Sequence, residues 1–274
     1  MNIVILRGGA PRRRRNDTRN TGSRSPESGT RDRGVMAISA GDDGRASRKW
    51  VLVNMSPAVA HQLDSDLRLD QYPGLPDGEL RTVVLTDAQV DHVGGLLSLR
   101  DGSPIDLYAT PAVFEELTTS LPVLPVLQHY CGVHWHVVPV AGDRLQASFR
   151  VEGLPNLEFT AVATRTPAPP HMARGEHGVV GDSIALAIRD TVTGQRVFCA
   201  PGLAQPGSDA FEWMQGADCL LMDCPAPDAA PDWLATLRTL PARHKVLLGA
   251  PVHSLEGLGD DGISLAYDGM EIQL

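Results

Sequence analysis

The stretch from Leu85 to Arg100 constrains the fold and the function of this chain more than any other. It follows residues 80–85, an apolar and β-branched run typical of a strand buried on both faces of a sheet. Gly94 and Gly95 then predict a close backbone approach that opens into a short helix. Between strand and glycines stand four polar groups at the place where α/β proteins build their sites: Asp87, Gln89, Asp91 and His92.

These polar groups allow two interpretations. Carboxylate and imidazole side chains that follow a buried strand are suited to binding a metal ion or to moving a proton. An Asp-His pair in a loop is also a common surface turn. Spacing alone favours neither interpretation.

The composition limits the size of the protein, its location and its partners. The 274 residues are 42% hydrophobic and only 5% aromatic, enough for one large domain or two small ones with an aliphatic core. We expect a soluble, cytoplasmic protein, since no apolar run reaches the roughly 18 residues of a transmembrane helix. A net charge of -9 argues against nucleic acid and anionic membranes as partners. The cysteines form no Cys-x-x-Cys pair and are interpreted as packed thiols: Cys131, Cys199, Cys219 and Cys224.

Strands and helices alternate in the first half of the chain. Two predicted helices begin with a capping residue followed by proline, at Ser56 and at Thr110. The strands around them are predicted at 1–6, 34–39, 49–54, 80–85 and 105–109, with 34–54 forming a hairpin.

The second half is richer in strands. Successive short strands at 134–140, 149–151, 157–162, 183–188 and 196–200 predict a second sheet. Strands and helices then alternate again, and residues 263–274 are predicted to close the chain as a hairpin with its turn at Asp268-Gly269. Two β-rich halves with helices outside them predict a four-layer αββα sandwich.

Three further segments carry candidate functional groups. Residues 11–33 hold eight arginines and predict a mobile, solvated loop, with a clamp for phosphate or acidic peptide as the alternative. The loop 166–182 carries His171 and His177. Asp223 ends a predicted buried strand, and His253 follows the next strand closely enough to join it.

The chain resembles a known family at several points. Residues 87–92 look like a degenerate form of the His-x-His-x-Asp-His motif of the metallo-β-lactamase fold, with Asp91 and His92 retained. The wider pattern resembles the coenzyme PQQ synthesis protein B family, in the phrases Trp50–Pro57, Val90–Arg100, Ala200–Leu203, Gly216–Asp223 and Asp268–Met270. The resemblance spans nearly the whole chain and implies a single domain, 1–274.

The resemblance implies a role in making pyrroloquinoline quinone (PQQ) from a ribosomal precursor peptide. Two kinds of role follow: a metal-dependent hydroxylase of the precursor's tyrosine, or a carrier that transports PQQ or its precursor. A diverged paralogue acting on another peptide-derived metabolite is a third. The implied partners are the peptide-derived precursor or quinone product and other PQQ-pathway proteins, and a homodimer is left open.

The resemblance also implies a site. Asp91 and His92 would form its core, with Asp223 and His253 completing a site for one Fe(II) or Zn ion, while Asp87 orients His92. The competing hypothesis is that the carboxylates only accept hydrogen bonds from the amides of Gly94 and Gly95. No cysteine precedes Cys131, so the family's structural zinc is not expected. Pro201 and Gly249 stand where the superfamily has ligands, which argues against a dinuclear hydrolase.

Overall fold

The computed structural model describes residues 1–8, 34–40, 49–65, 80–164, 171, 178–201, 208–224, 230–249 and 262–274. The predicted arginine-rich loop 11–33, His177 and His253 lie outside these ranges.

The first sheet has seven strands and mixes two pairing modes. It is antiparallel from β14 to β3 and parallel from β3 to β6. In spatial order its strands are β14 (Met270–Gln273), β1 (Asn2–Arg7), β2 (Val35–Ser39), β3 (Val51–Val53), β4 (Thr82–Val84), β5 (Ile105–Ala109) and β6 (Val133–Val137).

The second sheet also has seven strands. It is parallel from β13 to β10 and antiparallel from β10 to β7. In spatial order its strands are β13 (Ile263–Leu265), β12 (His244–Leu248), β11 (Cys219–Asp223), β10 (Arg196–Ala200), β9 (Ile184–Asp190), β8 (Leu157–Ala163) and β7 (Gln146–Phe149).

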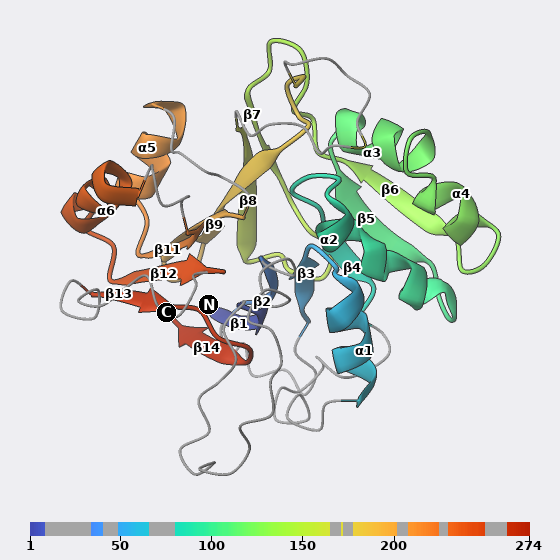
Figure 1. The fold of residues 1–274 in the computed structure, drawn as a ribbon, viewed down its shortest axis with the longest axis horizontal. Coiled ribbons are helices and arrows are strands. Elements are labelled where there is room, and N and C mark those ends of the chain that lie inside the picture. Colours follow the sequence, from blue (N-terminus) through green and yellow to red (C-terminus); the bar gives the residue numbers. More distant parts are fainter. Residues whose placement is uncertain are drawn as a thin grey trace, which may run out of the picture.

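Helices cover the outer flanks of the paired sheets (Figure 1). The first sheet is flanked by α1 (Pro57–Ser65), α2 (Val90–Val93), the 3-10 helix η3 (Gly94–Arg100), α3 (Pro111–Thr118) and α4 (Val123–Gln128), and the second sheet by α5 (Ser208–Gln215) and α6 (Ala230–Thr239). Both predicted caps are present: Ser56 Oγ accepts from Val59 N at 3.3 Å and Thr110 Oγ1 from Val113 N at 3.2 Å. The predicted αββα sandwich is confirmed. No helix in the described ranges is both long and apolar enough to cross a bilayer.

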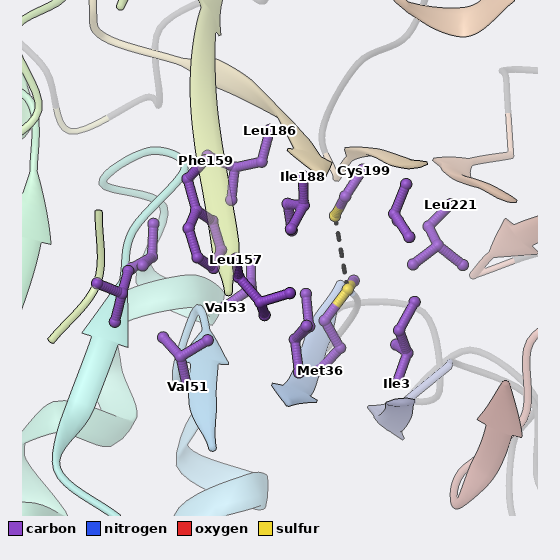
Figure 2. Packing of buried hydrophobic residues seen from close by; sticks show 14 of the residues in the cluster. Ile3, Met36, Val51, Val53, Leu157, Phe159, Leu186, Ile188, Cys199 and Leu221 are labelled. Carbon is purple, nitrogen blue, oxygen red and sulfur yellow. Dashed lines mark hydrogen bonds between the residues drawn. The ribbon is translucent and has the colours of Figure 1, made fainter. Parts of the chain in front are cut away.

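Three apolar layers hold the sandwich together. One fills the space between the sheets, and the other two lie between each sheet and its helices. Figure 2 shows the middle layer, where Phe159 and Leu186 of the second sheet face Val51 and Val53 of the first. The sulfurs of Met36 and Cys199 meet across it at 3.5 Å. Because most strands bury both faces, they appear in the sequence as continuous apolar runs.

Three predictions of local structure were wrong. The strand predicted at 134–140 is β6, and it extends the first sheet rather than the second, because Trp135 stacks on Phe114 of α3 with ring centroids 3.7 Å apart. Residues 149–151 are not a strand; β7 ends at Phe149. By contrast, the short helix predicted to open at the glycines is confirmed: it is η3, which begins at Gly94 directly after α2.

The predicted C-terminal hairpin is also wrong. Asp268-Gly269 does form a turn, but the strands on either side of it join different sheets. β13 pairs in parallel with β12, whereas β14 pairs antiparallel with β1. Asp268 ties the turn to the end of β1, because its carboxylate accepts from Gly8 N at 3.0 Å and from Arg7 Nη1 at 2.7 Å.

Candidate functional site

The site lies at one edge of the sandwich, where several strands end. Asn54 follows β3, Thr86 and Asp87 follow β4, and Pro201 follows β10. Gly34 lies immediately before β2, which runs antiparallel to β3 and therefore begins at the same edge. The carboxyl ends of parallel strands thus bring polar groups from distant parts of the chain together.

Asp87 and His92 form a buried pair at this edge. His92 Nδ1 lies 2.7 Å from Asp87 Oδ1 and 2.8 Å from Oδ2. The residues are only 1% and 4% exposed. Oδ1 also accepts from Gln89 N at 2.9 Å, and the Asp87 backbone forms an antiparallel bridge with Ser183 of the second sheet. The carboxylate is therefore fixed, and it fixes the imidazole ring.

The other ring nitrogen of His92 faces Gly34. A Cβ atom built on Gly34 would lie 3.7 Å from His92 Nε2 and only 2.4 Å from Pro201 Cβ. Gly34 has a φ of +72°, a conformation that glycine adopts without steric cost. The absence of a side chain there lets β2 approach both Pro201 and the imidazole.

The loop that carries His92 is held by the chain after β3. Met55 N donates to the carbonyl of His92 at 2.6 Å, and Gly95 N donates to the carbonyl of Met55 at 2.9 Å. Gly94 N donates within its helix to Val90 O. The hypothesis that carboxylates accept from the amides of Gly94 and Gly95 was therefore wrong, since backbone carbonyls take both N–H groups.

The other predicted metal ligands that the structure describes do not form a group with His92 in the way that Asp87 does. Asp91 is half-buried in the first turn of α2, and Asp223 is the last residue of β11. His253, the fourth predicted ligand, is not among the described residues. Within the described part of the chain, no three His, Cys, Asp or Glu side chains are arranged to hold a metal ion. The structure thus joins Asp87 to His92 but builds no three-donor group from Asp91, His92 and Asp223.

Three other histidines lie away from this pair. His171 Nε2 is 3.8 Å from Oε1 of the buried Glu116 on α3. His134 Nδ1 and His136 Nε2 both approach Asp106 Oδ1, at 3.4 and 3.0 Å. Asp106 is near the start of β5, away from the strand ends that carry Asp87.

Sequence reasoning missed Asn54 and Gly34. Asn54 is fully buried with a φ of +62°, the left-handed region that Asn tolerates better than most residues. Its side chain contacts Gly34 and Thr86. The available signal was a polar amide directly after the buried strand 51–53, the same pattern that marked Asp87 after β4.

Comparison with known proteins identifies the family. Residues 49–249 match the model of the beta-lactamase superfamily domain. The chain is 33% identical over 272 residues to coenzyme PQQ synthesis protein B of Klebsiella pneumoniae, an alignment that covers 87% of this chain and 85% of the relative. The chain belongs to the coenzyme PQQ synthesis protein B family. A relative in this family from Nitrosococcus oceani is 41% identical over 176 residues, covering 64% of this chain and 57% of the relative.

Solved structures support the fold of this family member. A crystal structure of Zn2+-bound PqqB from Methylobacterium extorquens matches with a TM-score of 0.66 at 22% identity, over 100% of both chains. The structure of unliganded yeast PDE1 matches with a TM-score of 0.62 at 10% identity, over 100% of this chain and 99% of the other. At these identities the likeness concerns the fold.

Proposed function

We propose that this member of the coenzyme PQQ synthesis protein B family acts on the peptide-derived precursor of PQQ and hydroxylates its tyrosine at a mononuclear metal site built on His92. Family membership makes the chain an accessory protein of PQQ biosynthesis. The finer assignment rests on one observation, the buried pair of Asp87 and His92, in which the carboxylate holds Nδ1 and Nε2 faces Gly34.

Among the described residues, His92 has the surroundings typical of a metal ligand. Histidines that ligate a metal usually donate their other ring N–H to a carboxylate, which fixes the ring and makes the ligating nitrogen more basic. His92 has this arrangement, with Nδ1 on Asp87 and Nε2 facing Gly34. Asp91, Asp223 and His253 are the proposed further ligands. An Fe(II) ion held there would supply the one-electron chemistry that oxygen activation requires; Zn would not.

The chain's own residues have separate roles in this proposal. Asp87 holds the proton of Nδ1 and keeps the ring from rotating. Gly34 lets the start of β2 lie against Pro201 and His92 Nε2, since any side chain there would collide with Pro201. The burial of both members of the pair keeps bulk water away from their hydrogen bond.

Metal analysis and oxygen consumption test the proposal together. After anaerobic reconstitution with Fe(II), we expect about one bound iron per chain, as for a mononuclear site. We also expect oxygen uptake that depends on a peptide containing the Glu and Tyr of the precursor. His92→Ala should lose both. His129→Ala, at an exposed position at the end of α4, is the matched control and should lose neither.

Two outcomes would contradict the proposal. An iron-loaded protein that takes up no oxygen in the presence of the peptide is not this hydroxylase. Saturable binding of PQQ or its precursor that survives His92→Ala, without turnover, would instead indicate a carrier.

A further inference from the structure

The side chains around Asn54 form a connected set of hydrogen bonds whose directions can be deduced. Asn54 Oδ1 accepts from the backbone N–H of Thr86 at 3.0 Å, and Asn54 Nδ2 donates to the carbonyl of Gly34 at 3.3 Å. A backbone N–H can only donate and a carbonyl can only accept. These two contacts therefore fix which end of the amide is oxygen and which is nitrogen.

The hydroxyl of Thr86 continues this set of hydrogen bonds. Asn54 Nδ2 donates its second hydrogen to Thr86 Oγ1 at 2.9 Å. The single hydroxyl hydrogen then has two acceptors at 3.1 Å, Asn54 Oδ1 and Asp87 Oδ2. Asn54 Oδ1 already accepts from Thr86 N, whereas the carboxylate offers a stronger, charge-assisted bond. The hydroxyl therefore donates to Asp87.

An ionised Asp87 only accepts hydrogen bonds, so His92 Nδ1 must carry a hydrogen and donate it. In the neutral ring, Nε2 is then the bare nitrogen. The same amide of Asn54 holds the carbonyl of Gly34, the residue that Nε2 faces.

We propose that Asn54 is a positioning residue: through Thr86 it holds the Asp87 carboxylate against His92 Nδ1, and through its own amide it holds Gly34 in front of Nε2. This inference rests on the proposed function only in taking Nε2 as the metal-binding atom. The tautomer itself can be measured without any metal.

Asparagine meets requirements at this position that its closest relatives do not. Its backbone adopts the left-handed conformation, which glycine and aspartate also tolerate. Glycine lacks a side chain to make these bonds. Aspartate can accept from Thr86 N, but it cannot donate to Gly34 O, and its second oxygen would attract the Thr86 hydroxyl away from Asp87.

The relay is the series of hydrogen bonds from Asn54 to Thr86 and from Thr86 to Asp87. Asn54→Asp and Thr86→Val interrupt it at two points with little change in shape, whereas Thr86→Ser keeps the hydroxyl. Asn156→Asp is the control for the added charge. Asn156 lies before β8, and the bonds it receives from Thr191 go to its backbone carbonyl.

The experiment measures the 15N shifts of the His92 ring in metal-free protein and the affinity of each variant for Zn2+. We expect wild type, Thr86→Ser and Asn156→Asp to show hydrogen on Nδ1 alone. Asn54→Asp and Thr86→Val should show a mixture of tautomers and bind Zn2+ about tenfold more weakly, at the low end of the loss seen when second-layer partners of metal ligands are removed.

The outcomes separate this inference from the proposed function. A wild-type ring with hydrogen on Nε2, or unchanged tautomers in both disrupting variants, would overturn the relay. If the tautomers behave as expected but wild type binds no metal, the relay stands and the proposed hydroxylase fails. Should Asn54→Asp not fold, as judged by circular dichroism, Thr86→Val alone decides.

Discussion

Gly95 packs against the backbone of Ser56 so closely that a Cβ atom on Gly95 would lie 2.3 Å from the Ser56 carbonyl oxygen and 2.8 Å from that of Met55. Both atoms belong to main chain that is itself hydrogen-bonded, so neither can move freely. The contact fixes the loop that carries His92 onto the end of β3.

Gly95→Ala should therefore destabilise the protein. We expect a loss of about 2 to 3 kcal/mol, in the range for an atom forced into a closely packed interior. Thermal unfolding followed by circular dichroism measures this. Gly216→Ala is the control, since the nearest atom to its Cβ would be the end of the flexible Arg196 side chain, at 3.4 Å, and backbone atoms would lie at ordinary contact distance. Equal stability of the two variants would show that the 54–56 backbone can yield.

A second prediction concerns Asp87, which accepts hydrogen bonds from Thr86, Gln89 and His92. Asp87→Asn keeps the shape but offers one acceptor oxygen in place of two and removes the charge. If His92 ligates the metal as proposed, metal affinity should fall about 10- to 100-fold, the usual loss for a carboxylate behind a ligating histidine. Competition with a chelating dye measures the affinity. Asp101→Asn, at an exposed carboxylate, should leave it unchanged.

The contact between Asp87 and His92 was predictable because the two residues are close in sequence and follow a strand with an unmistakable apolar pattern. The αββα layers were likewise visible, since strands buried on both faces leave continuous apolar runs. Local pattern carries this information without knowledge of distant contacts.

Contacts between distant segments were not predictable. Gly34 faces His92 because β2 begins at the edge where β3 and β4 end, and that depends on sheet order. The C-terminal turn shows the same limit. Asp268-Gly269 is turn-forming in any context, but only the partners β12 and β1 determine that its two flanking strands join different sheets.

A third prediction concerns Arg81, whose side chain binds several backbone carbonyls of one segment. Its guanidinium donates to the carbonyls of Leu99 at 2.6 Å and Ser103 at 2.8 Å, and also to that of Asp101. Lysine has no planar fork that can reach three carbonyls at once.

Arg81→Lys should cost about 1 to 2 kcal/mol, as expected for the loss of hydrogen bonds from a charged donor. Hydrogen exchange of the amides in 99–103 should become faster. Arg100→Lys is the matched control, because within the described ranges the Arg100 guanidinium makes one 3.4 Å bond to Leu97 O and an exposed pair with Asp101. Unchanged exchange in Arg81→Lys would mean that the segment is held by other contacts.

The last prediction concerns the four cysteines, none of which forms a disulfide. Burial, followed by the charge of Asp218, raises the pKa of Cys219 to about 12. The pKa of Cys199 is raised further, first by burial and then by Cys219 and Asp223. Cys131 and Cys224 are only partly buried.

At pH 8 a thiol reagent should therefore label Cys131 and Cys224 in the native protein, and all four only after unfolding, with mass spectrometry identifying the sites. Because the folded-state pKa of Cys219 exceeds its unfolded value near 9, its stabilising contribution is complete below about pH 9. That contribution is lost as the pH rises towards 12, so alkaline unfolding should begin in this window. Cys199→Ala, Cys219→Ala should shift that onset upward relative to its own neutral-pH stability, and rapid native labelling of Cys199 would contradict its burial.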